Sequence, residues 1–357
     1  MGLSFSMLRR LCRLWALEGH VDRLDRYHVS GWAARPGGRA PRLSIVVDGK
    51  VLDRIVPGMV RSDLRKIYRR PVQLGFNYVF DPPLREGAQV AVTDRFGQNV
   101  AKSPGRVPAE PPFDPASLND GLSTAVPPRD LIFLVVGHRD PQAFAVSRRP
   151  AVDFLLERLQ AAGVDVSSLR TILDFGCGCG RVLAGWEHVL PAQARLIGCD
   201  INPRLIAFCQ AQIPFARTFV SKFRPPLEGI QSGEIDFAYA ASVFTHLEPA
   251  DISLWSKELA RIIRPGGHLL LSFHGAGFDD VVARISDTGP EQLKATGIYT
   301  HLHSDPRRTS SGSNDYATFM TQSYVVGAFP LFEAVEILAG SSNAFMAGHD
   351  IVMFRRR

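Results

Sequence analysis

Cysteine is scarce in this sequence, with 5 in 357 residues, and no apolar run approaches the ~20 residues that a membrane-spanning helix needs. So few cysteines do not form a disulfide framework, and they indicate a reducing cytosol. Most of them lie near one glycine-rich stretch, at positions Cys177, Cys179, Cys199 and Cys209. Cys177 and Cys179 alternate across a tight turn, so we expect small buried side chains and no metal site.

Acidic residues are also few at the start of the chain. Residues 1–110 hold 19 Lys and Arg against 10 Asp and Glu, whereas the remainder holds 22 against 25. A solvated basic face explains this excess most simply. The alternative is an anionic partner for the N-terminal part, such as a phospholipid surface or an acidic glycan.

The first 18 residues lack the uninterrupted apolar core of ~7–15 residues that a secretory signal requires, because arginines at 9, 10 and 13 interrupt it. We interpret 1–18 as a leader and the protein as cytoplasmic. A short membrane-surface helix is the alternative, which would place the protein at the inner face of the membrane.

Residues 19–105 show short alternating runs separated by turn residues, which predicts a small all-β sandwich domain. The strand candidates are Tyr27–Ala33, Arg42–Asp48, Val51–Val56, Leu74–Phe80 and Gln89–Thr93. Asp48-Gly49 between two of them is a strong hairpin signal. Residues 106–129 are rich in proline outside any periodic pattern, so we expect an inter-domain linker there.

The most informative stretch is Thr171–Leu183, TILDFGCGCGRVL, followed by the strand at Arg195–Pro203, RLIGCDINP. It predicts a strand, a glycine-rich turn and a helix that begins at Arg181. Glycines leave the main chain open to a cofactor beside the helix N-terminus. Asp200 ends the next strand at the spacing where a carboxylate meets a ribose diol.

The elements that follow have the order of one doubly wound α/β sheet. We expect a helix at Pro203–Gln212, a third strand ending at Val220, and a fourth strand within Glu234–Leu247. Leu259–His274 then predicts a helix, a Pro-Gly-Gly turn and a fifth strand. A helix at Ala151–Ala162 should pack on the sheet just before its first strand.

With these motifs, residues Ala151–Arg357 resemble the class I S-adenosylmethionine-dependent methyltransferases. The resemblance implies a Rossmann-like domain over 130–357 that ends in an antiparallel hairpin, at Leu331–Leu338 and Ile351–Phe354, and that binds S-adenosylmethionine. The cofactor-binding positions it implies are Asp174, Gly176, Gly178, Gly180, Arg181, Asp200, Ile201, Phe223 and Ser242. Arg181 is expected to pair with the methionyl carboxylate of the cofactor or with a surface acid.

One feature departs from the family. Many members carry an Asp after the third strand for the adenine amino group, whereas this chain has Ser221-Lys222-Phe223. A backbone carbonyl together with stacking by Phe223 could replace that contact.

The N-terminal segment resembles a β-sandwich module that recurs beside bacterial surface-glycan glycosyltransferases. The residues that carry the resemblance are Gly31-Trp32-Ala33, Asp48-Gly49, Arg61–Leu64 and Gly75-Phe76. It implies glycan modification in a bacterium and a glycosyltransferase as a possible partner. Trp32 and Phe76 could stack on a sugar, but core packing is the simpler interpretation.

A hydroxyl acceptor needs a general base, and histidine suits proton removal at cellular pH. His246 is the first candidate because it follows the fourth strand, at the edge of the sheet where open α/β folds bind ligands. His274, at the end of the fifth strand, is the second candidate, and His301 and His303 come after it. Glu248 and Asp251 fit helix-start residues better than catalytic carboxylates.

Two segments are expected to cover the site. The long polar stretch 275–316 predicts an unstructured insertion that caps the acceptor. His138, Asp140 and Phe144, which precede the first sheet strand, are candidates for contact with the cofactor, with a surface turn as the alternative.

The sequence therefore predicts a methyltransferase, acting on a sugar or other glycan-related hydroxyl by in-line methyl transfer with a histidine base. The alternatives are a non-catalytic cofactor-binding scaffold and a methyltransferase for a lipid, a small molecule or a nucleic acid. Asp174 disfavours a nicotinamide-dependent oxidoreductase. A nucleic-acid substrate is disfavoured because no Asn-Pro-Pro-Tyr motif follows the fourth strand.

Overall fold

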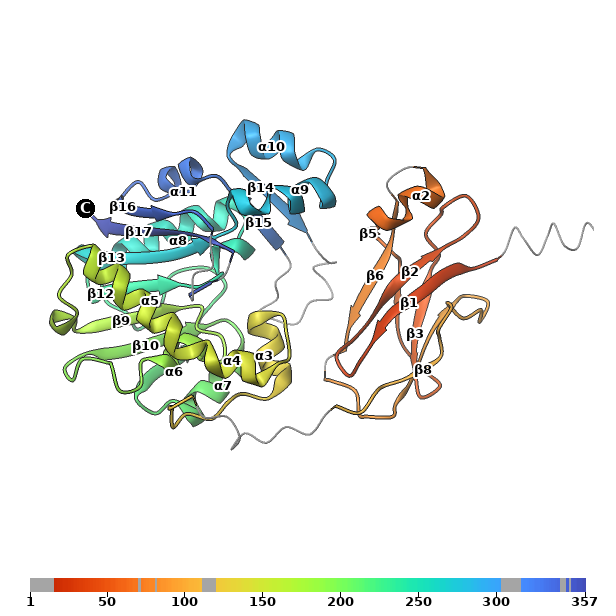
Figure 1. Cartoon of the computed structure of the whole chain (residues 1–357), viewed down its shortest axis with the longest axis horizontal. Helices are drawn as coiled ribbons and strands as arrows, with labels where there is room; N and C mark the ends of the chain where they lie inside the picture. Colours follow the sequence, from red (N-terminus) through yellow and green to blue (C-terminus); the bar gives the residue numbers. More distant parts are fainter. Residues whose placement is uncertain are drawn as a thin grey trace, which may run out of the picture. The chain divides into compact units, whose positions relative to one another are not determined.

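The computed structural model describes residues 16–69, 72–80, 82–110, 120–302, 316–340, 345–346 and 348–357 (Figure 1). The chain forms two compact units, Met1–Phe113 and Asp114–Arg357, and the boundary between them falls within the stretch predicted as a linker. Residues 1–15 of the predicted leader, 111–119 of the linker, and His303 lie outside the described residues. None of the helices in the described ranges is long and apolar enough to cross a membrane.

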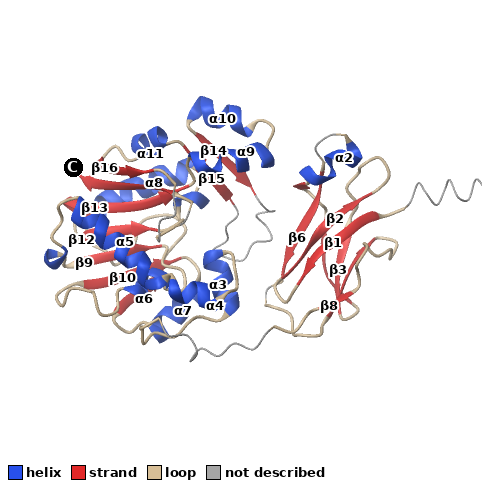
Figure 2. Ribbon diagram, viewed as in Figure 1, coloured by secondary structure: helices blue, strands red, loops and turns tan. Residues whose placement is uncertain are grey.

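The N-terminal unit contains two four-stranded antiparallel sheets (Figure 2). Their orders are β1-β2-β6-β5 and β4-β3-β7-β8. The elements are β1 (Glu18–Leu24), β2 (His28–Ala34), β3 (Leu43–Val47), β4 (Lys50–Ile55), β5 (Met59–Val60), η1 (Ser62–Leu64), α2 (Arg65–Tyr68), β6 (Gln73–Val79), β7 (Gln89–Asp94) and β8 (Gly105–Arg106).

Apolar side chains from both sheets share one core, including Val29 and Phe76 from one sheet and Ile45 and Val90 from the other. The predicted Asp48-Gly49 hairpin is confirmed. Both residues have positive φ, 47° and 81°, and they join β3 to β4. Such a two-residue turn matches the twist of the strands that it connects.

The C-terminal unit is built on a seven-stranded sheet of order β11-β10-β9-β12-β13-β17-β16 (Figure 2). The first five strands are parallel, whereas β17 is antiparallel to both β13 and β16. The strands are β9 (Thr171–Phe175), β10 (Arg195–Asp200), β11 (Ala216–Val220), β12 (Ile235–Ala240), β13 (Ile263–Phe273), β16 (Phe332–Leu338) and β17 (Asp350–Arg356).

Helices cover both faces of this sheet. The helices on one face are α5 (Arg148–Ala161), α6 (Arg181–Gly185) and α7 (Pro203–Gln212), and those on the other are α8 (Pro249–Ile262) and α11 (Gln322–Ala328). All residues of β9 and β12 are buried, as parallel strands between two helical layers require. The predicted helix at Pro203–Gln212 is confirmed with the same bounds.

Two sequence expectations are corrected here. The Pro-Gly-Gly segment does not form a turn between α8 and the fifth strand. Strand β13 already begins at Ile263 and includes this segment, where its pairing register with β12 shifts. The described part of the insertion 275–316 has regular structure. It forms η5 (Ala276–Phe278), α9 (Asp279–Ile285), α10 (Gly289–Thr296) and β14 (Ile298–Leu302), and β14 pairs with β15 (Tyr316–Met320).

The glycine-rich turn between β9 and α6 is fastened to the end of β10. The amides of Gly176 and Cys177 both donate to the Cys199 carbonyl, at 2.8 and 2.9 Å. Gly176 has a φ of 77°, and a Cβ added there would lie 2.3 Å from Cγ2 of Val243. Only glycine satisfies both the backbone conformation and the close approach of this neighbour.

We therefore predict that Gly176→Ala lowers the free energy of unfolding by about 3 kcal/mol or more, because strain at positive φ adds to overpacking. Gly137→Ala is the matched control, since Gly137 also has a positive φ, 72°, but a Cβ there meets nothing within 4 Å. This control should lose only about 1 kcal/mol. Urea denaturation measures both, and equal losses would contradict the role of the close contact.

Candidate functional site

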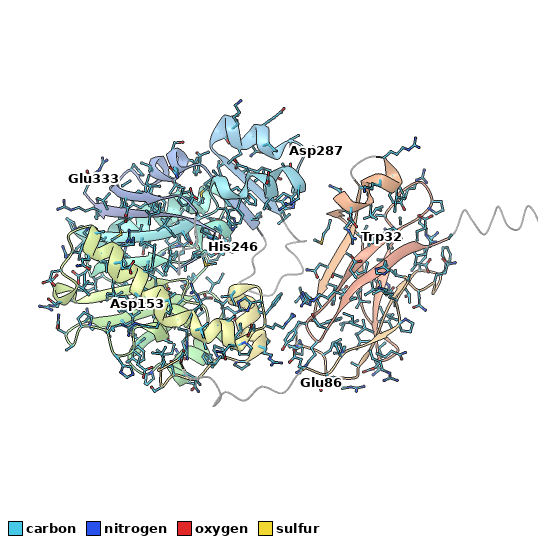
Figure 3. All side chains as sticks on the ribbon, in the orientation of Figure 1. Trp32, Glu86, Asp153, His246, Asp287 and Glu333 are labelled. Carbon is cyan, nitrogen blue, oxygen red and sulfur yellow. The ribbon has the colours of Figure 1, made fainter. Side chains whose placement is uncertain are left out.

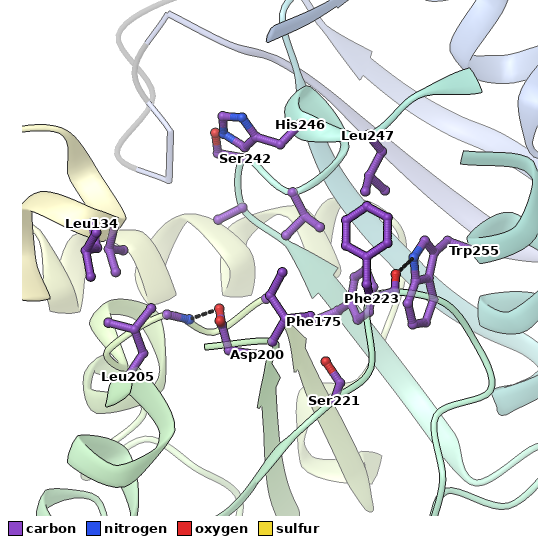
Figure 4. A pocket seen from close by; sticks show the side chains of 16 residues that line it. Leu134, Phe175, Asp200, Leu205, Ser221, Phe223, Ser242, His246, Leu247 and Trp255 are labelled. Atoms are coloured by element: carbon purple, nitrogen blue, oxygen red, sulfur yellow. Dashed lines mark hydrogen bonds between the residues drawn. The ribbon is translucent and has the colours of Figure 1, made fainter. Parts of the chain in front are cut away.

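A pocket of about 150 Å³ lies at the carboxyl ends of β9, β10 and β12 (Figure 4). Open α/β sheets bind ligands at this edge, where the strand order reverses direction. The residues that line it are Leu134, Val135, Phe175, Gly176, Gly178, Asp200, Ile201, Leu205, Ser221, Phe223, Ala241, Ser242, Val243, His246, Leu247 and Trp255. Seven predicted site residues are among them: Gly176, Gly178, Asp200, Ile201, Phe223, Ser242 and His246.

Asp200 joins the end of β10 to the glycine turn. Its Oδ2 accepts the amide of Gly178 at 3.0 Å, and its Oδ1 accepts the amide of Asn202 at 2.8 Å. Burial raises the pKa of this carboxyl, and the two amides act in the opposite direction. A carboxylate has lone pairs for about four hydrogen bonds, so these two amides leave capacity for a ligand's hydroxyls.

The wall beyond β11 is aromatic. Phe223 is 48% exposed although it is a large apolar side chain, and its carbonyl accepts Nε1 of Trp255 at 3.2 Å. Ser221, beside it, donates its amide to the Asp200 carbonyl. An exposed ring held at the edge of a pocket suits stacking on a planar ligand group.

Helix α3 (Arg129–Val136) covers the opposite wall of the pocket. Leu134 and Val135 line the pocket, whereas His138, Asp140 and Phe144 do not. Asp140 instead caps α4 (Pro141–Val146), and Phe144 is a buried residue of that helix. An ion pair between Asp130 and Arg204 ties α3 to α7.

Asp174, Gly180 and Arg181 lie outside the pocket lining. Burial raises the pKa of the Asp174 carboxyl to about 8, and the nearby guanidinium of Arg181 opposes this shift. Arg181 is itself buried and donates to the Phe345 carbonyl at 2.5 Å, and it forms no ion pair with an acidic residue in the described ranges. Its pairing with the methionyl carboxylate of the cofactor stays a prediction. Asp174 Oδ2 has no hydrogen-bond partner within the described ranges.

Asp174 and Arg181 therefore form a buried layer behind the glycine turn. Tyr239 of β12 is the register partner of Asp174 in β9, and its hydroxyl accepts Nε1 of Trp186 at 3.0 Å. Asp174 and Arg181 are thus both buried and outside the lining of the pocket.

His246 lies in the η4 turn (Phe244–His246) that follows β12, at the end of the pocket away from Asp200 (Figure 4). Its Nδ1 is 2.9 Å from the Tyr316 carbonyl. A carbonyl only accepts, so Nδ1 carries the hydrogen and Nε2 is the acceptor in the neutral ring. Burial lowers the pKa of His246, which favours this neutral form.

The second candidate base, His274, does not line the pocket. It lies among aromatic rings of the insertion, with centroids 4.3 Å from Phe278 and 5.1 Å from Phe319. The ring of His349 packs edge-on against it at 4.6 Å. Burial and the nearby His246 lower the pKa of His349 to about 4.

His349 and the wall residues Leu134, Val135 and Trp255 were missed by the sequence interpretation. Leu134 and Val135 lie in an apolar run at helical spacing that could have revealed a covering helix, whereas His349 stands in no recognisable motif. His301 lies on β14, away from the pocket lining. The helix-start interpretation of Glu248 and Asp251 is confirmed, because they stand at the N-cap and in the first turn of α8.

The pocket residues fit a nucleoside-bearing cofactor. A Cβ at Gly178 would lie 2.7 Å from Cγ2 of Val135, so α3 can pack this closely on the turn only because the residue is glycine. The Asp200 carboxylate offers acceptors for ribose hydroxyls, and Phe223 offers an exposed ring for a base. No group of three or more metal-ligating side chains occurs among the described residues.

Part of the chain is similar to known methyltransferases. Residues 172–267 match the family model of a methyltransferase domain. Over 107 residues the chain is 34% identical to a tRNA N(3)-methylcytidine methyltransferase of Schizosaccharomyces pombe, a match that covers 28% of this chain and 42% of that protein. The chain thus spans less than half the length of this curated relative.

Solved structures show distant likeness. An S-adenosylmethionine-bound amino pentose methyltransferase from Micromonospora echinaspora aligns with 59% of this chain and 92% of its own, at 15% identity and a TM-score of 0.41. An S-adenosylmethionine-dependent methyltransferase from Mesorhizobium loti aligns with 57% of this chain and 98% of its own, at 16% identity and a TM-score of 0.40.

The family match runs from β9 into β13 and contains the glycine turn, Asp200 and His246. This part of the chain is a methyltransferase domain, and S-adenosylmethionine is its cofactor.

We predict that Asp200→Ala weakens S-adenosylmethionine binding about 100-fold in a calorimetric titration, because the ribose hydroxyls lose a charged acceptor. NAD should give no binding heat with the unaltered protein.

Asp236→Ala is the matched control for this titration. Asp236 is also buried and accepts two amides, those of Arg170 and Thr171, both at 2.8 Å, at the opposite end of the sheet. This variant should lose stability but keep its affinity. Equal loss of affinity in both variants would argue that Asp200 acts only through the fold.

Proposed function

We propose that this protein transfers a methyl group from S-adenosylmethionine to a hydroxyl of a sugar or glycan-related acceptor, with His246 as the general base. The observation that carries the proposal is the hydrogen bonding and protonation of His246. Its Nδ1 donates to the Tyr316 carbonyl, Nε2 makes no hydrogen bond to a described residue, and burial lowers the pKa of the ring. His246 also belongs to the pocket wall, as Figure 4 shows.

The cofactor supplies a methyl group that the sulfonium charge has already activated for in-line displacement. The protein therefore has to align the acceptor, exclude water and remove one proton. Asp200 and the glycine turn form one end of the pocket, and apolar side chains such as Leu205 and Val243 line its walls. His246 Nε2 takes the hydroxyl proton, which leaves an imidazolium whose Nδ1 still donates to Tyr316.

A sugar acceptor also suits the N-terminal unit. A hollow of about 300 Å³ on its β1-β2-β6-β5 sheet presents polar side chains that include Asp22, Arg61 and Asn77. Phe76 is only 4% exposed and belongs to the core, so sugar stacking on it is not part of the proposal. Figure 3 labels Trp32, which packs on a second small core with Leu64 and Leu74.

We place the protein in the cytoplasm, with an anionic membrane surface and a glycosyltransferase as the candidate partners of residues 1–110. The excess of Lys and Arg in this segment supports the first, because basic surfaces attract anionic lipid.

A nucleobase acceptor is the second candidate. It is favoured by the 34% identity, over 107 residues, to a tRNA N(3)-methylcytidine methyltransferase. A ring nitrogen acts as nucleophile through its own lone pair and needs no base to remove a proton. The two candidates therefore differ in how much of the rate should depend on His246.

We predict that His246→Asn lowers kcat by about 10²–10⁴-fold, because a general base contributes that much. Asn can still donate to Tyr316 from the position of Nδ1, so the turn should persist and the affinity for S-adenosylmethionine should change little. His274→Asn is the control and should retain far more activity. A nucleobase acceptor would instead leave His246→Asn nearly as active as the unaltered enzyme.

The pH dependence follows from the same group. Burial lowers the pKa of His246 below 6.5, and the neutral ring is the active form. The value of kcat should therefore be constant above pH 6.5 and fall only as the pH drops through the lowered pKa. A fall that begins above pH 7 would contradict a buried neutral base.

Acceptor class is tested with the full chain and radiolabelled S-adenosylmethionine. We expect methyl transfer to oligosaccharides with free hydroxyls and no transfer to tRNA or cytidine. The reverse pattern would establish the nucleobase function instead.

A further inference from the structure

Strand β15, which begins where the insertion 275–316 ends, contacts both candidate histidines. One edge of β15 pairs with β14 in an antiparallel ribbon. Toward the sheet, the Tyr316 carbonyl lies 2.9 Å from His246 Nδ1, and the Thr318 carbonyl lies 3.2 Å from His274 Nδ1.

Because residues two apart in a strand direct their carbonyls to the same side, this arrangement depends on the register of β15. Both partners are carbonyl oxygens, so each neutral imidazole must carry its hydrogen on Nδ1. The amide of Met320 continues the series by donating to the His274 carbonyl at 2.9 Å.

A single side chain fixes this register against the η4 turn. Thr318 is fully buried, and its hydroxyl donates to the Leu247 carbonyl at 2.8 Å. Leu247 directly follows His246, so the bond holds the histidine's own turn to the strand that supplies its acceptor. Thr300, opposite on β14, has its hydroxyl 3.2 Å from that of Thr318 but no such bond to the turn.

We propose that β15 is a positioning strand for the base and that Thr318 is a positioning residue for His246. Thr318 acts through the main chain: it holds the Tyr316 carbonyl against Nδ1, which leaves Nε2 as the proton acceptor. This inference rests on the proposed role of His246, but it makes a structural claim that can be measured without turnover.

The direct measurement is the tautomer of His246. Long-range ¹H–¹⁵N correlation spectra of the full chain with ¹⁵N-labelled histidine report which ring nitrogen carries hydrogen, and His246→Asn and His274→Asn assign the signals. We expect the Nδ1–H form for His246 above pH 7. The Nε2–H form in the unaltered protein would overturn the proposal, whatever the activity.

The variant is Thr318→Val, which has nearly the same shape but no hydroxyl. We expect mixed tautomers for His246 and a fall in kcat on the order of tenfold, with unchanged affinity for S-adenosylmethionine. Thr300→Val is the matched control and should keep both the tautomer and kcat. Thr318→Ser restores the hydroxyl and should recover both.

The outcomes separate the two hypotheses. If Thr318→Val keeps the Nδ1–H tautomer and full kcat, Thr318 has no positioning role. If His246→Asn is fully active while the unaltered protein shows the expected tautomer, the proposed base fails but the positioning of the ring stands. If Thr318→Val does not fold, the tautomer of the unaltered protein and the Thr318→Ser variant decide.

Discussion

The site depends on the attachment of the glycine turn to the end of β10. One carbonyl, that of Cys199, accepts two successive amides of the turn, and the side chain of the next residue, Asp200, accepts a third. The turn can follow this path only because its glycines adopt positive φ. The carboxyl ends of β9 and β10 therefore lie side by side, with the amides of the glycine turn hydrogen-bonded between them.

Charge in this region is kept away from the reacting end of the pocket. Asp174 and Arg181 are buried together behind the turn, and burial shifts both pKa values toward the uncharged forms. Burial likewise lowers the pKa of His246 and His349. In a site of low dielectric, a cationic methyl donor would then meet a neutral histidine, so a second positive charge would not oppose its approach.

The sequence predicted the parts of the site that local physics determines. The glycine turn, the acid at the end of β10 and the helix that begins at Pro203 depend on residues close together in the chain. Leu134 and Trp255 could not be placed in the same way, because tertiary packing brings them to the pocket from separate helices. Arg181 follows a family motif, yet its side chain is buried and bonded to the Phe345 carbonyl, because a motif fixes spacing and not the direction of a long side chain.

The insertion shows why composition was a poor guide to structure there. Its polar residues suggested an unstructured connection, but α9 and β14 pack with β15 around one small core that buries Val282, Tyr299 and Phe319. A two-stranded ribbon is marginally stable alone. Here the second edge of β15 accepts hydrogen bonds from His246 and His274, and the Thr318 hydroxyl donates to the Leu247 carbonyl, so the contacts that stabilise the ribbon are also those that orient the histidines. A shift of β15 would therefore alter the hydrogen bonds of both histidine rings, through the main chain of one strand.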